Sequence, residues 1–304
     1  MLWHVSDLRG HGGEWGHRHV ARLAAPRLSV DRLRALWDFD DLDGSERRFR
    51  EQLAQEETEA GRAEVLTQLA RVEGLRGDFE AAERLLQDAE ALAGSSAVAN
   101  VRVDLERGRK LRSSGDGTSA LPLFESAFAR AHESGEYYLA GDAAHMAAIA
   151  TPGAMVEWTQ RGIELAEREP DAAYWAGPLF NNLGWHLHEA GEHEAALDAF
   201  ERGLAVRERD PANEYATEIA RYTVGFALRS LGRPAEAAAQ LERAVAWSER
   251  AGMPDAYFHE ELAEDYAALG RADEAREQAT SALALVDGGA EPERAARLRE
   301  LAAR

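Results

Sequence analysis

The chain contains no cysteine, and only one of its 35 basic residues, Lys110, is a lysine. A chain without cysteine has no disulfide framework and no thiol chemistry. No apolar run approaches the roughly 20 residues that a membrane-spanning helix needs. Arginines and histidines interrupt every apolar run of the first 30 residues, so the apolar core of a signal peptide is missing. We therefore expect a cytoplasmic protein with no membrane partner.

Basic residues are also few relative to acidic ones, 35 against 55, which gives a net charge of −20. Phosphate backbones repel a chain of this charge, so no nucleic-acid partner is expected. The sequence lacks the P-loop, the H-E-x-x-H zinc motif and the G-x-S-x-G nucleophile motif. These absences argue against an enzyme, and the sequence predicts no catalytic residue and no cofactor.

Two groups of histidines invite the interpretation of a metal site. One lies within the first 20 residues and follows no established ligand spacing. The other consists of His186, His188 and His193. His186 and His188 are two residues apart, so on a helix they point in different directions, and His193 follows a turn glycine. Neither group therefore predicts bound metal.

Glycines recur along the chain at nearly regular intervals, each with small residues at fixed distances. The glycines are Gly77, Gly115, Gly191, Gly232 and Gly270. An alanine stands five residues after each: Ala82, Ala120, Ala196, Ala237 and Ala275. Seven residues before each stands another small residue: Ala70, Gly108, Gly184, Gly225 and Ala263. Glycine accepts the left-handed conformation that ends helices, and small residues let two helix backbones approach closely. The pattern therefore predicts repeated helix pairs.

Residues 180–211 show the unit most completely, as Phe180-x-x-Leu183-Gly184-x-x-Leu187, then Gly191, Ala196-x-x-x-Phe200 and Pro211. This pattern resembles the tetratricopeptide repeat, a helix-turn-helix unit of about 34 residues. A single unit cannot bury its own apolar face and needs neighbours. The resemblance implies an all-α fold, a right-handed superhelix of about six helix pairs closed by helical caps.

One interval, from Gly115 to Gly191, spans about two periods, and we expect a degenerate repeat within it. Its first helix is predicted over residues 139–149 and its second over residues 154–166. The turn between them contains Pro152 in place of part of the usual glycine turn.

The predicted organisation has four segments. They are a flexible tail (1–28), N-terminal capping helices (29–62), six repeats (63–286) and a C-terminal capping helix (290–304). Ser29 is predicted to cap the first N-terminal helix, which carries Leu33, Leu36 and Trp37 on one face. The acidic stretch 38–44 that follows is predicted to be a solvated loop.

In tetratricopeptide proteins the first helices of successive repeats line a concave groove, so the resemblance implies that partner-binding residues lie there. Placed by the turn glycines, the candidates are arginines at one end and aromatic residues in the middle. They are Arg71, Arg102, Arg109, Arg112, Asn181, Trp185, His188, Tyr222, Phe226 and Arg229. Arginines would hold carboxylate or phosphate groups, and aromatic rings would anchor apolar side chains. Alternatively, the aromatic residues pack between repeats and the arginines pair with the chain's many carboxylates.

The expected function is a non-enzymatic module that binds a protein or peptide partner in this groove. Two alternatives stay open. The chain could self-associate, as a homodimer for example, and act as an assembly scaffold. It could also be a peptide-sensing regulatory protein that acts through a partner, because its long repeats resemble those of bacterial peptide-sensing regulators.

Overall fold

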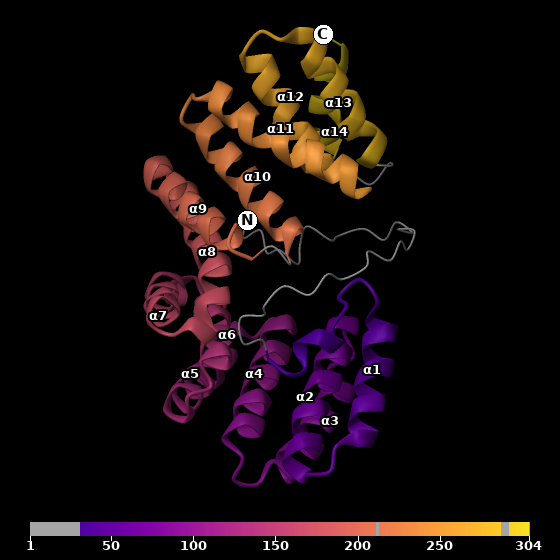
Figure 1. Ribbon diagram of the computed structural model, residues 1–304, viewed down its shortest axis with the longest axis vertical. Helices are drawn as coiled ribbons and strands as arrows, with labels where there is room; N and C mark the ends of the chain where they lie inside the picture. Colours follow the sequence, from indigo (N-terminus) through magenta and orange to yellow (C-terminus); the bar gives the residue numbers. More distant parts are fainter. Residues whose placement is uncertain (1–30, 211–212, 287–291, 304) are drawn as a thin grey trace. The chain divides into compact units, whose positions relative to one another are not determined.

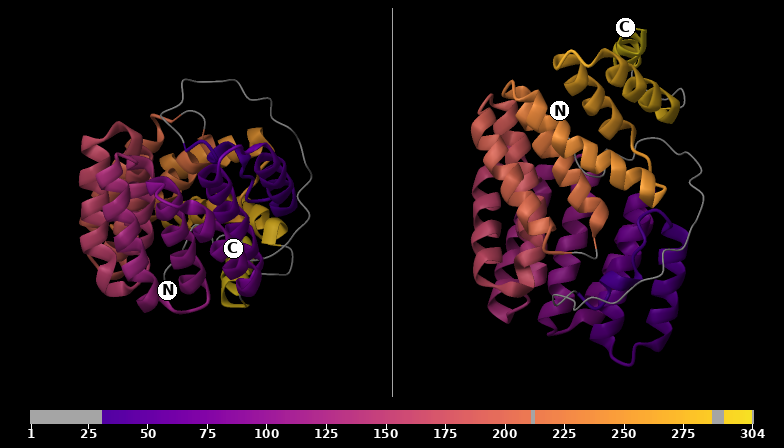
Figure 2. Two further views of the ribbon diagram at one scale, coloured as in Figure 1. Left: turned by 90° about the horizontal axis from the view of Figure 1, so that it is seen from below. Right: turned by 45° about the horizontal axis from the view of Figure 1, so that its top comes forward.

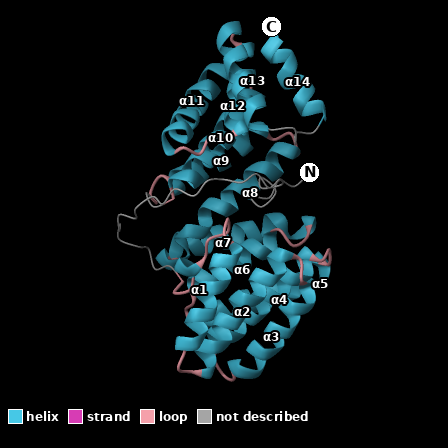
Figure 3. Cartoon of the chain, turned by 90° about the vertical axis from the view of Figure 1, so that its right-hand side faces the viewer, coloured by secondary structure: helices cyan, strands magenta, loops and turns pink. Residues whose placement is uncertain are grey.

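The computed structural model describes residues 31–210, 213–286 and 292–303. Over these residues the chain forms fourteen α-helices and three short 3-10 helices and contains no strand (Figure 1, Figure 3). The all-α prediction is thus confirmed. The predicted tail, Ser29 and Pro211 lie outside the described residues. No helix in the described ranges combines the length and apolarity needed to cross a bilayer.

The chain divides after Leu179 into two compact units, which we call the N-terminal unit (residues 31–179) and the C-terminal unit (residues from Phe180 onward). Figure 2 gives two further views of the helices that make up each unit.

The N-terminal unit begins with a 3-10 turn, η2 (Arg34–Leu36), and helix α1 (Leu42–Gln55). Three helix pairs follow. They are α2 (Glu59–Arg76) with α3 (Phe79–Ala93), α4 (Ala97–Ser113) with α5 (Gly117–Ser134), and α6 (Tyr137–Ala148) with α7 (Met155–Arg168). Two 3-10 segments, η3 (Pro152–Ala154) and η4 (Pro170–Trp175), border α7. The first helices of successive pairs, α2 with α4 and α4 with α6, are in contact.

The C-terminal unit contains three further pairs, of which the first includes the part of α8 beyond Leu179. They are α8 (Ala176–Glu189) with α9 (His193–Arg207), α10 (Glu214–Ser230) with α11 (Pro234–Ala251), and α12 (Ala256–Ala268) with α13 (Ala272–Val286). The last described helix, α14 (Pro292–Ala303), packs against α12 and α13.

The turn glycines have the conformation that the sequence predicts. Gly77 and Gly191 have φ angles of 83° and 81°, and the three other turn glycines are also left-handed. At Gly77 and Gly191 the turn residue's N–H bonds a carbonyl in the last turn of the preceding helix. These bonds satisfy carbonyl groups that the end of a helix would otherwise leave without a partner.

The small residues of the first helices are sites of close packing. A Cβ atom added to Gly108 would lie 2.5 Å from the ring of Phe124, and one added to Gly184 would lie 2.4 Å from that of Phe200. Both rings are almost completely buried. The absence of a side chain at these positions therefore lets the phenylalanine of the second helix enter the pair.

The third pair differs from the others, although its two helices lie where the degenerate repeat is predicted. A Cβ atom on Gly141 would lie 2.3 Å from Trp175, which belongs to η4 and not to the second helix of its pair. Residues 170–175 therefore take over part of the packing that α7 would supply in a regular repeat.

The predicted N-terminal cap also differs from the structure. Between residues 31 and 41 there is only the three-residue turn η2, so α1 is the one α-helix before the first repeat in the described residues. Leu33 and Trp37 are buried against α1 and α2, where they contact Phe49 and Leu69. The first helix of the repeats starts at Glu59, before the predicted boundary at 63, and Thr58 caps it.

Candidate functional site

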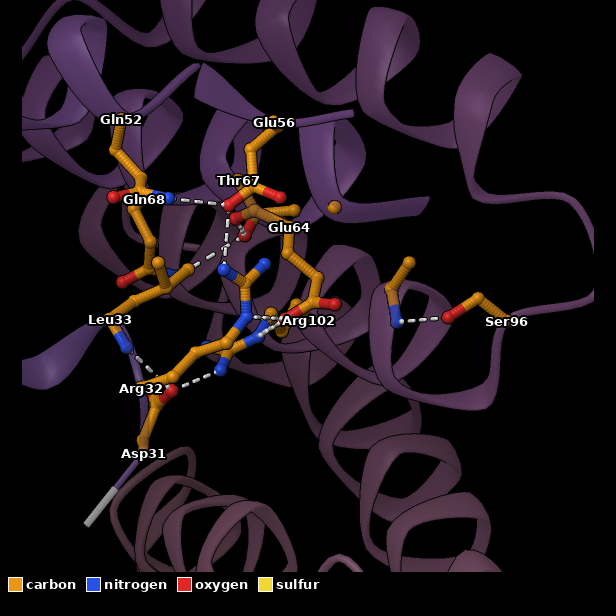
Figure 4. A network of polar contacts seen from close by, with 12 residues as sticks. Asp31, Arg32, Leu33, Gln52, Glu56, Glu64, Thr67, Gln68, Ser96 and Arg102 are labelled. Atoms are coloured by element: carbon orange, nitrogen blue, oxygen red, sulfur yellow. Dashed lines mark hydrogen bonds and ion pairs between the residues drawn. The ribbon is translucent and has the colours of Figure 1, made fainter. Parts of the chain in front are cut away.

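The candidate residues of the N-terminal unit lie on α2 and α4. Arg102 on α4 is almost completely buried, and both of its terminal nitrogens bond the carboxylate of Asp31 (Figure 4). Its Nε lies 3.3 Å from Glu64 on α2. Arg32 bonds the same Glu64 and also Glu56. This network attaches the segment before α1 to two first helices, so Arg102 already has internal partners.

Arg109 also has internal partners. Its guanidinium bonds Glu106 and Asp142, each at 2.5 Å, and thereby links α4 to α6. Burial alone would raise the pKa of Asp142, but the charges of Arg109 and Arg71 and the hydrogen bond from Arg109 together outweigh burial, and the pKa is lowered. Arg112 donates from its Nε to the carbonyl of Ile149 at 3.0 Å.

Arg71 on α2 is in a different environment. Its guanidinium carbon lies 5.3 Å from the ring centroid of Trp37 and 5.2 Å from that of Phe39. These two rings stack on each other at 4.7 Å. Trp37 donates a hydrogen bond from its indole N–H to Gln68 at 2.9 Å, which fixes it on α2. Arg71 makes no hydrogen bond or ion pair with the described residues.

The candidate residues of the C-terminal unit form an aromatic patch, which we define as Trp185 and His188 of α8 with Phe226 and Arg229 of α10. The ring centroid of Phe226 lies 5.1 Å from that of Trp185 and 4.9 Å from that of His188. The guanidinium of Arg229 lies 5.5 Å from the Phe226 ring. All four residues are partly exposed, although Trp185 also packs against the buried ring of Phe200. The structure thus brings residues from two successive first helices together.

Polar contacts hold the edges of the aromatic patch. Arg229 bonds Glu261 of α12 and lies 3.8 Å from Asp265. The Nε2 of His188 is 2.9 Å from the hydroxyl of Ser230. Burial, and then the neighbouring His193, lower the pKa of His188.

The remaining candidates lie beside the aromatic patch. Tyr222 is buried against Phe258, and this burial raises the pKa of its hydroxyl well above the ordinary value. Asn181 lies half-buried on α8. The side chains of His188 and His193 are close, with ring centroids 4.6 Å apart, but the described residues contain no cluster of three potential metal ligands.

Two residues of interest were not predicted from the sequence. Arg34 and Phe39 precede the repeats, and Phe39 lies in the acidic stretch that the sequence presents as a solvated loop. Its ring centroid instead lies 5.2 Å from the guanidinium carbon of Arg34 and 5.2 Å from that of Arg71. Repeat spacing could not indicate this contact, because the segment lies outside the repeats.

Helix pairs with small residues at their crossings, stacked through their first helices, define an α-α solenoid. Models described as "tetratricopeptide repeat" match residues 179–209 and residues 63–88, 220–243 and 256–286. The chain thus contains tetratricopeptide repeats over these residues, and its fold fits a protein-interaction module. The matched ranges include helices of four of the six pairs.

Solved structures of low sequence identity share the fold. The apo form of RapI is 13% identical with a TM-score of 0.66, over 85% of this chain and 76% of that one. The Cut9–Hcn1 hetero-tetramer of APC/C matches with 14% identity and a TM-score of 0.57, over 87% of this chain and 49% of that one. No curated protein matches the chain.

Proposed function

We propose that the protein is a non-enzymatic interaction module that binds a peptide or protein segment through its first helices. The observation that carries this proposal is the aromatic patch of the C-terminal unit. Phe226 is partly exposed, and the rings of Trp185 and His188 and the guanidinium of Arg229 lie near it. Aromatic residues and arginine dominate the binding energy of protein interfaces.

The charges around the aromatic patch support the same function. Arg229 is held by Glu261, and His188 contacts Ser230. Because these polar groups have partners within the protein, an incoming apolar side chain could cover Phe226 without leaving them unsatisfied. The aromatic patch is therefore suited to anchor an apolar residue of a partner.

A selection from random peptides tests the proposal. The immobilised full-length chain is exposed to a phage-displayed library, and the affinity of the enriched peptides is then measured for the parent and for Phe226→Ala. We expect a loss of about tenfold or more, the effect of removing an interface anchor. The control is Phe128→Ala, because Phe128 is a partly exposed ring on the second helix α5 that packs on Trp158.

Two results would contradict the proposal. One is a library from which the folded chain enriches no peptide. The other is equal loss of affinity in the two variants, which would mean that the aromatic patch has no special role.

A further inference from the structure

Arg71 is an exception among the arginines that the sequence places on the first helices. Arg102, Arg109 and Arg229 each bond a carboxylate, and Arg112 bonds a backbone carbonyl. Arg71 has neither kind of partner within the described residues. Because the chain has 55 acidic and only 35 basic residues, an arginine that forms no ion pair with a described carboxylate is unexpected.

A second cation of this kind lies beside it. Arg34 of η2 makes no side-chain hydrogen bond or ion pair with the described residues, and its guanidinium carbon lies 5.2 Å from the ring centroid of Phe39. The guanidinium of Arg71 lies at the same distance from that ring. Burial, followed by the charges of Arg109 and Arg34 among others, lowers the pKa of Arg71. Two like charges held beside one ring repel each other and favour an anion between them.

No nearby carboxylate of the described residues is the anion that pairs with Arg71. Glu106 and Asp142 both bond Arg109, and neither approaches Arg71 within ion-pair distance.

We propose that Arg34 and Arg71 form a subsite for a carboxylate of a bound peptide, the side chain of a glutamate or aspartate. The planar guanidinium matches a carboxylate with two parallel hydrogen bonds. The stacked rings of Trp37 and Phe39 hold the two cations in place by cation–π contact. This inference rests on the proposed function, because it assumes that the protein binds a peptide. It adds which chemical group of that peptide Arg34 and Arg71 would bind.

Direct binding to a defined probe tests the subsite. Fluorescence anisotropy compares a labelled peptide of four glutamates with its glutamine counterpart on the full-length chain at low salt. The glutamate peptide binds more tightly, and Arg34→Gln or Arg71→Gln each weakens it by roughly tenfold, the effect of losing a charge-assisted hydrogen bond. Arg50→Gln, which removes an exposed arginine from α1, leaves the affinity unchanged. Equal binding of the two peptides, or an unaffected Arg71→Gln variant, overturns the inference.

The stability of the free protein supplies a second measurement. The melting temperature of Arg34→Gln should stay close to that of the parent, because relief of the repulsion with Arg71 offsets the lost cation–π contact with Phe39, so lost binding does not come from unfolding. A fall in the melting temperature of about ten degrees or more contradicts the inference, because Arg34 would then have a structural partner beyond the Phe39 ring.

The peptide library separates the two proposals. If the parent enriches peptides without acidic residues and Arg71→Gln binds them equally well, the carboxylate subsite is wrong and the interaction function stands. If the parent enriches no peptide, the proposed function itself fails.

Discussion

Arg102 and Asp31 form a buried ion pair that attaches the segment before the first helix to the second helix pair. Their side chains are only 5% and 10% exposed. Both terminal nitrogens of Arg102 bond the carboxylate (Figure 4). Together with the hydrogen bond from Trp37 to Gln68, the pair holds the segment that carries Arg34, Trp37 and Phe39.

Loss of this ion pair should be costly. We expect Arg102→Ala to lower the free energy of unfolding by about 3–5 kcal/mol, because it leaves buried carboxylates without their partner. Urea denaturation followed by circular dichroism measures the change. The control is Arg50→Ala, whose exposed pair with Glu46 is expected to contribute about 0.5 kcal/mol or less. Equal effects of the two substitutions would mean that Asp31 is not held as described.

The glycines at the helix crossings give a second prediction. Gly184→Ala should destabilise the protein by about 1–3 kcal/mol, because the new Cβ atom would meet the ring of Phe200. Adding Phe200→Leu should recover part of the loss by making space.

A matched glycine without such a contact is Gly74 on α2, where a Cβ atom would meet nothing within 4 Å. Gly74→Ala should stabilise the protein by about 0.5–1 kcal/mol, since alanine is the better helix former. Thermal denaturation of both variants checks the pair of predictions, and destabilisation by Gly74→Ala would argue against the packing given for α2.

The helix pairs could be predicted from the sequence because each depends on local features. A left-handed glycine such as Gly191 and a small residue such as Gly184 act within one repeat, so their spacing alone reveals them. The degenerate repeat was predicted instead from the interval of about two periods between Gly115 and Gly191. The packing of Trp175 against Gly141 was not predicted. Trp175 belongs to η4, a 3-10 segment after the third helix pair whose sequence does not have the repeat spacing.

The candidate site was less predictable for a related reason. Spacing indicates which helix face a residue occupies, but not which partner it meets. Arg102 and Arg71 both lie on first helices, yet one bonds Asp31 while the other lies over aromatic rings. The difference arises from the segment before the repeats, whose course the repeat pattern does not describe.

Trp185 should behave as a packing residue more than as a binding residue. It contacts the buried ring of Phe200 at a centroid distance of 5.4 Å and packs against the apolar clusters of α8 to α12. We expect Trp185→Ala to cost about 3 kcal/mol of unfolding free energy. His188→Ala should cost about 1 kcal/mol or less, because it removes mainly one partly exposed hydrogen bond. Chemical denaturation of both variants measures this, and a smaller cost for Trp185→Ala than for His188→Ala would contradict it.

Asp265 should make the stability of the protein depend on pH. Its side chain is fully buried, and neither carboxylate oxygen accepts a hydrogen bond within the described residues. Burial raises its pKa from 3.8 to about 8, with Glu261 and Glu264 adding to the shift and Arg229 opposing it. The folded state therefore favours the protonated acid, whereas the unfolded chain ionises near the ordinary pKa. The contribution of Asp265 is most favourable below about pH 4 and is lost as the pH rises to about 8.

Substitution of Asp265 by asparagine removes the ionisation but keeps the shape. At pH 8, Asp265→Asn should be more stable than the parent by at least about 1 kcal/mol, and at pH 4 the two should be nearly equal. Asp142→Asn provides the opposite case, because Arg109 lowers the pKa of Asp142 against the effect of burial. That variant should be less stable than the parent at neutral pH, by about 1–3 kcal/mol. The difference in stability should shrink as the pH falls and Asp142 becomes protonated in the parent. Urea denaturation across the pH range measures both series, and a stability difference for Asp265→Asn that does not grow between pH 4 and pH 8 would show that Asp265 is ionised in the folded protein.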